Sequence, residues 1–527
     1  MKKILFILSM ALSMTFVACQ KSDFEESYAD PSKISVTTVE KQFTGFLGSN
    51  KSYVLPDYGN YFVVLRTTLN HYTQVVGWEN SPNQYNPGSA GINDRWTNYY
   101  NFLAQYRELE KIYAKSTAAE QADKRIYKIA SAIYFYDHTQ KVVDLHGDIP
   151  FSSAGMLSIN GGDYTNSFAK YDNAETVYTK MLDDLKAFAD EMNTITVKAG
   201  ILTGFKTQDF VNKGDLMLWK KYCNSLRIRM LMRASSSSKF QSRATAEMTE
   251  ILANPTKYPV VSANADNIQI NVFDINTEIH SKGFRNGLED WDGNLAGKAM
   301  IDHMNANKDP RIKVIFEAGD NAVGVYKGLD PLAESAVQSA AIAGGTLSRY
   351  NRSTFSRNQF FPGVLINAAE VSFFIAEFYL KNGNNASAKT AYENGIKLST
   401  EAYYKYRTLS NDNTVPAATA ATTAEVQSYI NSSGINWANA NTDADKLSLI
   451  ANQKWIHYGI LQQTENWAEI RRFDLPKLSF QADNSSVQKQ PPLRWVYPSS
   501  EAVYNTVNYS EIKAKDNLTS KIFWDNQ

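Results

Sequence analysis

The stretch that decides the fold class reads Ala376-Glu377-Phe378-Tyr379-Leu380-Lys381-Asn382-Gly383-Asn384 and continues as Ala388-Lys389-Thr390-Ala391-Tyr392-Glu393-Asn394-Gly395-Ile396. Both halves have the apolar spacing of amphipathic helices, and the Asn/Gly run between them is typical of a tight turn. Small alanine side chains allow two helices to approach closely. The stretch therefore predicts a helical hairpin.

Helical periodicity continues on both sides of this hairpin. Apolar residues recur at helical spacing in residues 96–103, 126–133, 177–188, 216–230 and 371–378. We expect Asp172 and Glu175 to cap the helix that runs through 177–188. The hairpin resembles a tetratricopeptide unit, which stacks on its neighbours to bury a continuous core, although no clean repeat runs through the chain. We predict a mostly α fold of tetratricopeptide-like hairpins, with long loops that form a binding face.

Composition narrows the functional classes. The 527 residues include 54 basic and 54 acidic side chains, so the formal net charge is zero. A nucleic-acid-binding protein would carry a basic patch or domain, and no such excess is present. No apolar run after Cys19 is long enough to cross a membrane. Cys223 lies in an apolar helical stripe, where an unpaired cysteine behaves as a small buried hydrophobic residue.

The first residues have the pattern of a bacterial lipoprotein signal. Lys2 and Lys3 precede an apolar stretch that ends at Phe16-Val17-Ala18-Cys19. This pattern predicts a signal peptide over residues 1–18, lipidation of Cys19, and a flexible tether over residues 19–40. An ordinary secretory signal with a chance cysteine is the alternative. The remaining residues, 41–527, are expected to form one domain.

Six motifs, taken in chain order, resemble the SusD/RagB family of outer-membrane nutrient-binding lipoproteins. They are Asp144-Leu145-His146-Gly147-Asp148-Ile149-Pro150-Phe151, Gly214-Asp215 with Trp219–Arg233, Asp309-Pro310-Arg311, Ala369–Glu377, Gln453–Ile456 with Glu465–Arg472, and Arg494–Glu501 with Asn505. Each motif is weak alone, and together they cover nearly the whole mature chain. The acidic residues that follow Cys19 also resemble a surface-export signal of Bacteroidetes lipoproteins.

The resemblance implies a fold, a location and a partner. It implies one SusD-like α-helical domain in which four hairpins form a scaffold and loops on one side form the binding face. It places the protein on the cell surface at the outer membrane, held by its lipid anchor only, above a SusC-like TonB-dependent transporter. Known relatives bind glycans and some bind peptides, so both ligand classes stay open. Most of the motif residues are expected to be structural: Arg227, Arg229, Arg233, Arg471 and Arg472 should pair with acids between helices.

Other functions have weaker support in the sequence. The spacings of nucleotide-binding loops and zinc proteases are absent, and His146-Gly147-Asp148 is better explained as an interhelical turn with Asp148 as a cap than as part of a metal site. The alternating oxygens of 290–294 give only a faint calcium-loop pattern, because the glutamate that ends such a loop is missing. We therefore expect no catalytic residues, metal or cofactor. A tetratricopeptide-like scaffold and a surface glycoside hydrolase remain alternatives.

The candidate ligand-binding residues are rings and polar groups on loops or near helix starts. Long loops are expected at 80–93, 262–294, 319–359 and 410–424, and loops on a rigid scaffold commonly carry binding residues. The candidates are Trp78, Tyr85, Trp96, Asn101, Trp291 and Tyr350. An aromatic ring can stack on the apolar face of a sugar, while Asn, Asp and Arg orient its hydroxyls. For Trp96 a place in the core is equally expected.

Overall fold

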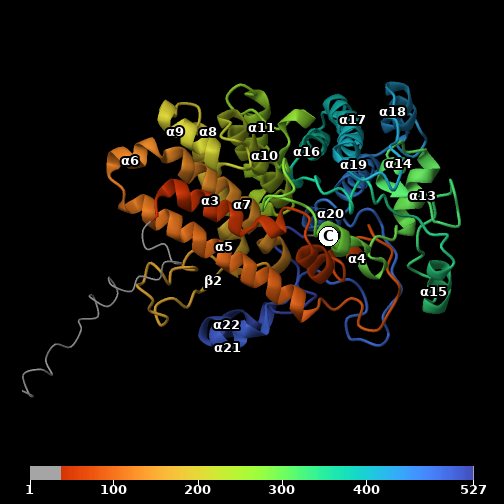
Figure 1. The fold of residues 1–527 in the computed structure, drawn as a ribbon, viewed down its shortest axis with the longest axis horizontal. Coiled ribbons are helices and arrows are strands. Elements are labelled where there is room, and N and C mark those ends of the chain that lie inside the picture. The colour runs from red at the N-terminus through yellow and green to blue at the C-terminus, as the bar shows by residue number, and fades with distance from the viewer. Residues whose placement is uncertain (1–36, 526–527) are drawn as a thin grey trace, which may run out of the picture.

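The computed structural model describes residues 37–525, and the element labels follow Figure 1. The predicted signal peptide, Cys19 and most of the predicted tether lie outside these residues. Within residues 37–525, the N-terminal half is built from η2 and η3 with nine α-helices and a first strand pair. The bounds are α3 (Val39–Ser49), η2 (Lys51–Tyr53), η3 (Gly59–Leu65), α4 (Leu69–Tyr72), α5 (Ser89–Lys115), α6 (Ala118–Asp123), α7 (Arg125–His146), β1 (Ile149–Pro150), β2 (Tyr171–Asp172), α8 (Ala174–Glu191), α9 (Ala199–Gln208), α10 (Leu216–Ala234) and α11 (Ser238–Ala253).

The C-terminal half mixes long helices with short irregular elements. Their bounds are η4 (Asn264–Asp266), β3 (Ile268–Ile270), α12 (Phe284–Glu289), η5 (Asp290–Asp292), α13 (Lys298–Asn307), α14 (Ile312–Ile315), β4 (Phe316–Glu317), α15 (Ser335–Ala343), β5 (Arg349–Tyr350), β6 (Gly363–Ile366), α16 (Ala368–Lys381), α17 (Asn385–Leu409), α18 (Thr423–Ile430), η6 (Trp437–Asn439), α19 (Asp443–Tyr458), α20 (Gln463–Phe473), α21 (Ser499–Tyr504), α22 (Thr506–Ile512) and η7 (Lys513–Lys515).

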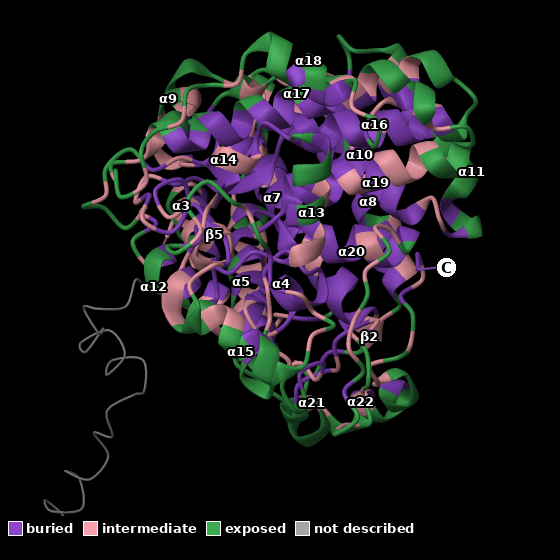
Figure 2. Cartoon of the chain, turned by 90° about the vertical axis from the view of Figure 1, so that its right-hand side faces the viewer, coloured by how far each residue is buried: buried purple, intermediate pink, exposed green. Residues whose placement is uncertain are grey.

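The long helices pack in pairs. Helix α5 packs on α7, α8 on α10, α16 on α17, and α19 on α20. In Figure 1 the first pair lies on the left, α16, α17 and α19 lie at the upper right, and α21 and α22 project at the lower edge. Figure 2 shows the buried residues concentrated in the long inner helices and the exposed ones on short outer helices such as α15 and α21. The predicted mostly α fold is confirmed.

The hairpin predicted from 376–396 is the α16–α17 pair. Gly383 adopts a left-handed φ of +74° in the turn, and the side chain of Asn384 accepts a hydrogen bond from the Ser387 backbone at the start of α17. The two helices approach closely at Gly395, where an added Cβ would lie 2.4 Å from a ring carbon of Phe373. The turn and the small residues therefore set the packing of this hairpin, as their pattern predicts.

Buried ion pairs connect the hairpins. Arg229 and Arg233 on α10 are fully buried and contact carboxylates on three other helices: Arg229 Nε lies 2.5 Å from Glu370 on α16, and Arg233 Nη2 lies 2.7 Å from Glu465 on α20. Arg472 donates to Glu377 at 2.6 Å. These contacts confirm a structural role for the motif arginines. Arg471 differs, because its Nη atoms donate to the backbone carbonyls of Asp144 and Leu493.

Several local expectations need correction. The side chain that caps α8 is Asn173, whose Oδ1 accepts from the Glu175 backbone at 2.9 Å; Asp172 instead pairs in β2. The segment 262–294 is only partly loop, because β3 pairs antiparallel with β6 and α12 follows. Cys223 is buried, as predicted, and its Sγ lies 3.3 Å from the Leu185 carbonyl oxygen. Asp148 acts as a cap, as predicted, because it accepts from the Ala174 backbone at 2.9 Å.

Two apolar cores underlie this arrangement. The larger core joins α3, α5, α7, α8, α10 and α16. The second core joins η3, α4, α13 and α14 to the C-terminal half of α17 and to α20. The irregular segments that cover the second core carry the candidate site described next. Within residues 37–525, no helix has the length and apolarity needed to span a membrane.

Candidate functional site

A cavity of about 600 Å³ opens between two segments that are far apart in the sequence. One wall comes from 76–82, which follows α4, and the other comes from 291–295, which follows α12. Its lining residues are Arg66, Val76, Gly77, Trp78, Glu79, Asn80, Ser81, Pro82, Trp291, Asp292, Gly293, Leu295, Ser335 and Ile342. Small-molecule sites commonly have volumes of about 300–1,000 Å³, so this cavity has the size of a ligand site.

Backbone contacts hold the two walls together. Val76 forms an antiparallel bridge with Ala296, and the Gly77 N–H donates to the Leu295 carbonyl at 2.8 Å. The approach is so close at Gly77 that an added Cβ would lie 2.7 Å from Cβ of Leu329. This bridge lies next to Trp78 on one side and close to Trp291 on the other. The cavity is therefore built on backbone pairing and does not depend on the loops alone.

Trp291 is the most exposed ring of the site. Its side chain is 79% exposed, and its backbone lies in the left-handed region at φ +57° and ψ +40°. A bulky residue is rarely found there, and such strain often marks functional positions. The Trp291 carbonyl accepts a hydrogen bond from Arg66 Nη2 at 3.1 Å, which fixes the turn. An indole held in solvent by a strained turn is well placed to stack on a ligand.

Trp78 forms the opposite, half-buried aromatic surface. Its ring stacks on His71 with 4.8 Å between centroids, and the Arg66 guanidinium lies 5.3 Å from its centroid. Its buried Nε1 finds no hydrogen-bond partner within residues 37–525. Burial lowers the pKa of His71 to about 3, so this imidazole is neutral and stacks as a flat apolar ring. The Trp78 ring is therefore held flat against a neutral imidazole beside the cavity.

Arg66 joins the two tryptophans. It contacts the Trp78 ring and the Trp291 backbone, and its Nε has no partner within the described residues. Burial lowers the pKa of Arg66, and the charge of Asp292 acts in the opposite direction. Arg66 was not among the predicted site residues, because it is identified only by its contact with Trp291, 225 positions away in the sequence. Its guanidinium can orient ligand hydroxyls or carboxylates.

The polar rim is partly occupied by internal contacts. The Asn80 amide nitrogen donates to the carbonyls of Pro331 and Ala333 at 3.0 and 3.1 Å, so this side chain fastens the loop. The Glu79 carboxylate accepts from Ser339. Asp292 and Ser81 are exposed at the mouth. The residues of 37–525 contain no cluster of three or more His, Cys, Asp or Glu that could hold a metal ion.

The structure brings two of the six candidates together and separates the other four. Trp78 and Trp291 line the same cavity. Asn101 is exposed on α5 and does not line this cavity.

Tyr85, Trp96 and Tyr350 are buried, and their polar atoms have internal partners. Tyr85 Oη donates to Gln481 O at 2.7 Å, Tyr350 Oη to Val75 O at 2.8 Å, and Trp96 Nε1 to Glu501 at 3.2 Å. Protein atoms cover these rings, so they have no free face for a sugar. Tyr85 and Tyr350 instead pack beneath the cavity walls, in the second core.

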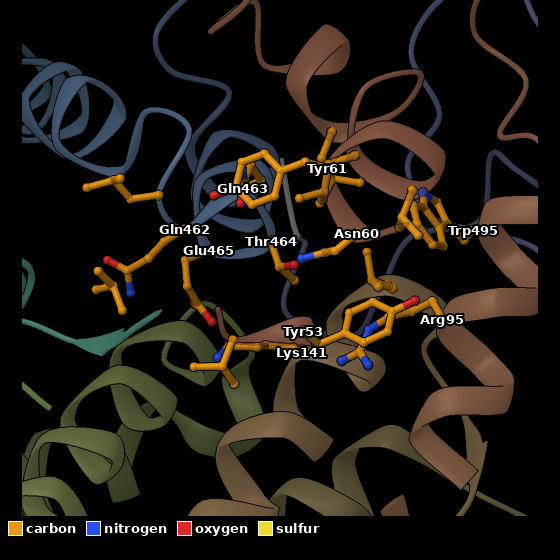
Figure 3. Close-up of a pocket in the computed structure, with 17 residues that line it drawn as sticks. Tyr53, Asn60, Tyr61, Arg95, Lys141, Gln462, Gln463, Thr464, Glu465 and Trp495 are labelled. Carbon is orange, nitrogen blue, oxygen red and sulfur yellow. The ribbon is translucent and has the colours of Figure 1, made fainter. Parts of the chain in front are cut away.

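Two other hollows have comparable size but suit a glycan less well. A hollow of about 480 Å³ beside α17 is lined by alanines, threonines and lysines, with Tyr404 as its one aromatic residue. A groove of about 490 Å³ among α5, α7 and α8 has an aromatic floor, but the rings are largely buried and Arg107, Arg125 and Lys180 are ion-paired. Figure 3 shows a further cavity of about 60 Å³, which is too small for a sugar.

Comparisons with known proteins extend these observations. A SusD-like family model described as "Starch-binding associating with outer membrane" matches residues 38–498. A Bacteroidetes SusD-like protein has a similar structure, with a TM-score of 0.73 at 20% identity over 93% of this chain and 100% of its own. A SusD homologue from Bacteroides fragilis gives a TM-score of 0.69 at 20% identity, over 93% and 100%. A chitin-binding SusD homologue from Flavobacterium johnsoniae gives 0.67 at 22% identity, over 93% and 99%. No curated protein matches the chain.

Proposed function

The chain belongs to the SusD-like family, and from this premise we propose that it is a surface lipoprotein that binds a glycan between Trp78 and Trp291 and delivers it to a TonB-dependent outer-membrane transporter. The observation that carries the proposal is the cavity of about 600 Å³ with an indole on each wall. The family description, starch binding in association with the outer membrane, supports both the ligand class and the location.

The chemistry of the cavity fits a sugar chain. A pyranose has an apolar C–H face and a rim of hydroxyls. The exposed Trp291 ring offers a stacking surface, and the Arg66 guanidinium that lines the cavity can bind hydroxyl oxygens. Because two similar solved proteins bind chitin, chitin oligosaccharides are the first ligands to test. A peptide ligand would be delivered to the same kind of transporter.

Anchoring and delivery rest on the sequence and the family. We place a signal peptide at 1–18, a lipidated tether from Cys19 to residue 40, and one SusD-like domain from 41 onward. A tether with one lipidated end lets the domain remain at the membrane while it contacts a barrel. Because capture proteins need no chemistry of their own, we propose that the chain is not an enzyme, and substrate integrity is the corresponding measurement.

The test is a screen by affinity electrophoresis against soluble polysaccharides, including glycol chitin and starch. Retention on one glycan class, with the glycan intact by chromatography, would support the proposal. Trp78→Ala should abolish the retention, whereas Trp78→Phe should keep part of it. Cleaved glycan would refute the non-enzymatic role, and retention on peptides alone would replace the ligand class. Co-purification of a TonB-dependent barrel with the tagged lipoprotein tests the delivery step separately.

A further inference from the structure

The small cavity in Figure 3 lies where the two apolar cores meet. It is lined by η2, η3, α5, α7 and the start of α20, so it joins the N-terminal segment to the helical scaffold. Figure 3 shows Arg95, Tyr53 and Trp495 on one side, Lys141 and Glu465 on the other, and Asn60 and Thr464 between them. About half of the lining residues are polar or charged, which is unusual for a place between two apolar cores.

Arg95 is a buried cation without an acidic partner. It is 5% exposed, and no hydrogen bond or ion pair of its guanidinium is found within residues 37–525. Its one close interaction is with the Tyr53 ring, whose centroid lies 4.5 Å away. The neighbouring Asp94 carboxylate is exposed and accepts from the Tyr53 hydroxyl. Burial lowers the pKa of Arg95 and outweighs the opposing charge of Asp94. Burial of a guanidinium without an ion pair costs several kcal/mol, so a negative group in the cavity would stabilise it.

The large ion-pair network next to the cavity does not supply that group. Its members are the cations Lys141, Arg229, Arg233, Lys381, Lys454 and Arg472 and the carboxylates Asp137, Asp144, Glu370, Glu377, Glu465 and Glu469. Six positive and six negative groups balance one another. Glu465, the carboxylate that lines the cavity, is already engaged by Arg233 at 2.7 Å. The charge of Arg95 is therefore additional to a neutral network.

Hydrogen-bond donors are in excess at the same place. Arg95 Nη1 and Trp495 Nε1 are both buried, line the cavity and have no acceptor within the described residues. Lys141 also lines the cavity, but its charge is balanced within the network by Asp137, 3.0 Å from Nζ. Asn60 and Thr464 add an amide and a hydroxyl at the rim. The two unpartnered donors and the charge of Arg95 make this a site for an acceptor that carries negative charge.

We propose that this cavity binds one small monovalent anion, of the size of chloride or formate, through Arg95 and Trp495. The volume of about 60 Å³ limits the choice. A buried water needs roughly 10–15 Å³ of such volume, so the cavity accepts about four waters or one small anion and excludes larger solutes. The anion would neutralise Arg95 and connect η3 and α5 to the segment around Trp495.

The first experiment follows the melting temperature of the purified protein in sodium chloride and sodium formate, with sodium glutamate at equal ionic strength as the reference. A rise in melting temperature that grows with the logarithm of anion concentration is expected for chloride and formate only. It should reach about 3 °C at a hundredfold excess over Kd, given the unfolding entropy of a chain of this length. Arg95→Met should lose this rise. Arg125→Met, which removes the partly exposed ion pair between Arg125 on α7 and Glu191 on α8, should keep it.

Equal responses to all three salts, or an equal chloride response in Arg95→Met, would overturn the proposal. A second measurement does not depend on a variant that folds. Crystals of the wild-type protein soaked in sodium bromide should give an anomalous peak within hydrogen-bond distance of Arg95 Nη1 and Trp495 Nε1. Ordered waters at that position, without anomalous signal, would show that the cavity is only a hydration site and refute the anion site.

Discussion

Removal of the Trp291 ring tests the proposed site, because the exposure of the ring allows the expected loss of glycan affinity to be estimated. Because the side chain is 79% exposed, Trp291→Ala removes few internal contacts. If a pyranose covers one face of the indole, roughly 80 Å² of apolar surface leaves water, and at ~25 cal/mol per Å² this contributes about 2 kcal/mol to binding. A loss of that size corresponds to roughly a thirtyfold rise in Kd. Calorimetry with the retained glycan measures it.

A matched control separates stacking from a general loss of surface aromatics. Tyr504 on α21 is 74% exposed and lies outside the cavity, so Tyr504→Ala should leave Kd unchanged. The stability of Trp291→Gly should equal or exceed that of the wild type, because glycine accepts φ +57° without the strain of a side chain. An unchanged Kd in Trp291→Ala, or an equal loss in Tyr504→Ala, would refute the stacking role of Trp291.

Further predictions concern three buried residues, Glu377, Cys223 and His71. Glu377→Gln should lower the free energy of unfolding by about 3–5 kcal/mol in denaturant titrations, against at most about 0.5 kcal/mol for the surface variant Lys389→Met. Burial alone would raise the pKa of Glu377, but Arg472 and two lysines lower it well below 4.5. The stability that the Glu377 carboxylate contributes is therefore full above about pH 4.5 and is lost as the pH falls further. Glu377→Gln should attenuate this loss of stability at low pH. Burial raises the pKa of Cys223 to about 12, so a thiol reagent should label it only after unfolding, and rapid labelling of native protein would contradict its place in the core. Glycan affinity should stay constant between pH 5 and 8, because His71 under Trp78 has a pKa of about 3; a protonation step in that range would exclude the neutral stack.

The helical scaffold was predictable because its signals are local. The Asn382-Gly383-Asn384 turn and the apolar stripes on each side define the α16–α17 hairpin without knowledge of any partner. The pairing of β3 with β6 was not predictable in this way, because Ile268 meets Ile366 across a long separation in the chain. Short strands carry too little periodicity to identify their partners.

The site was predictable only in part, for a related reason. Trp78 and Trp291 were selected because both lie in loop-like sequence, and the structure brings them to one cavity. Tyr85 and Tyr350 have similar local surroundings in sequence, yet their hydroxyls donate to carbonyls on distant segments and their rings are buried. Sequence spacing does not encode which hydroxyl finds an internal acceptor, so exposed and buried rings could not be distinguished.

The central claim is that a glycan binds intact between the two tryptophans. A crystal structure of the protein with the glycan retained most strongly in the screen tests this claim most directly. We expect an uncleaved sugar chain in the cavity, with one ring stacked on Trp291 and hydroxyls near Arg66. Glycan density in the groove among α5, α7 and α8 instead, or density for a cleaved product, would contradict it.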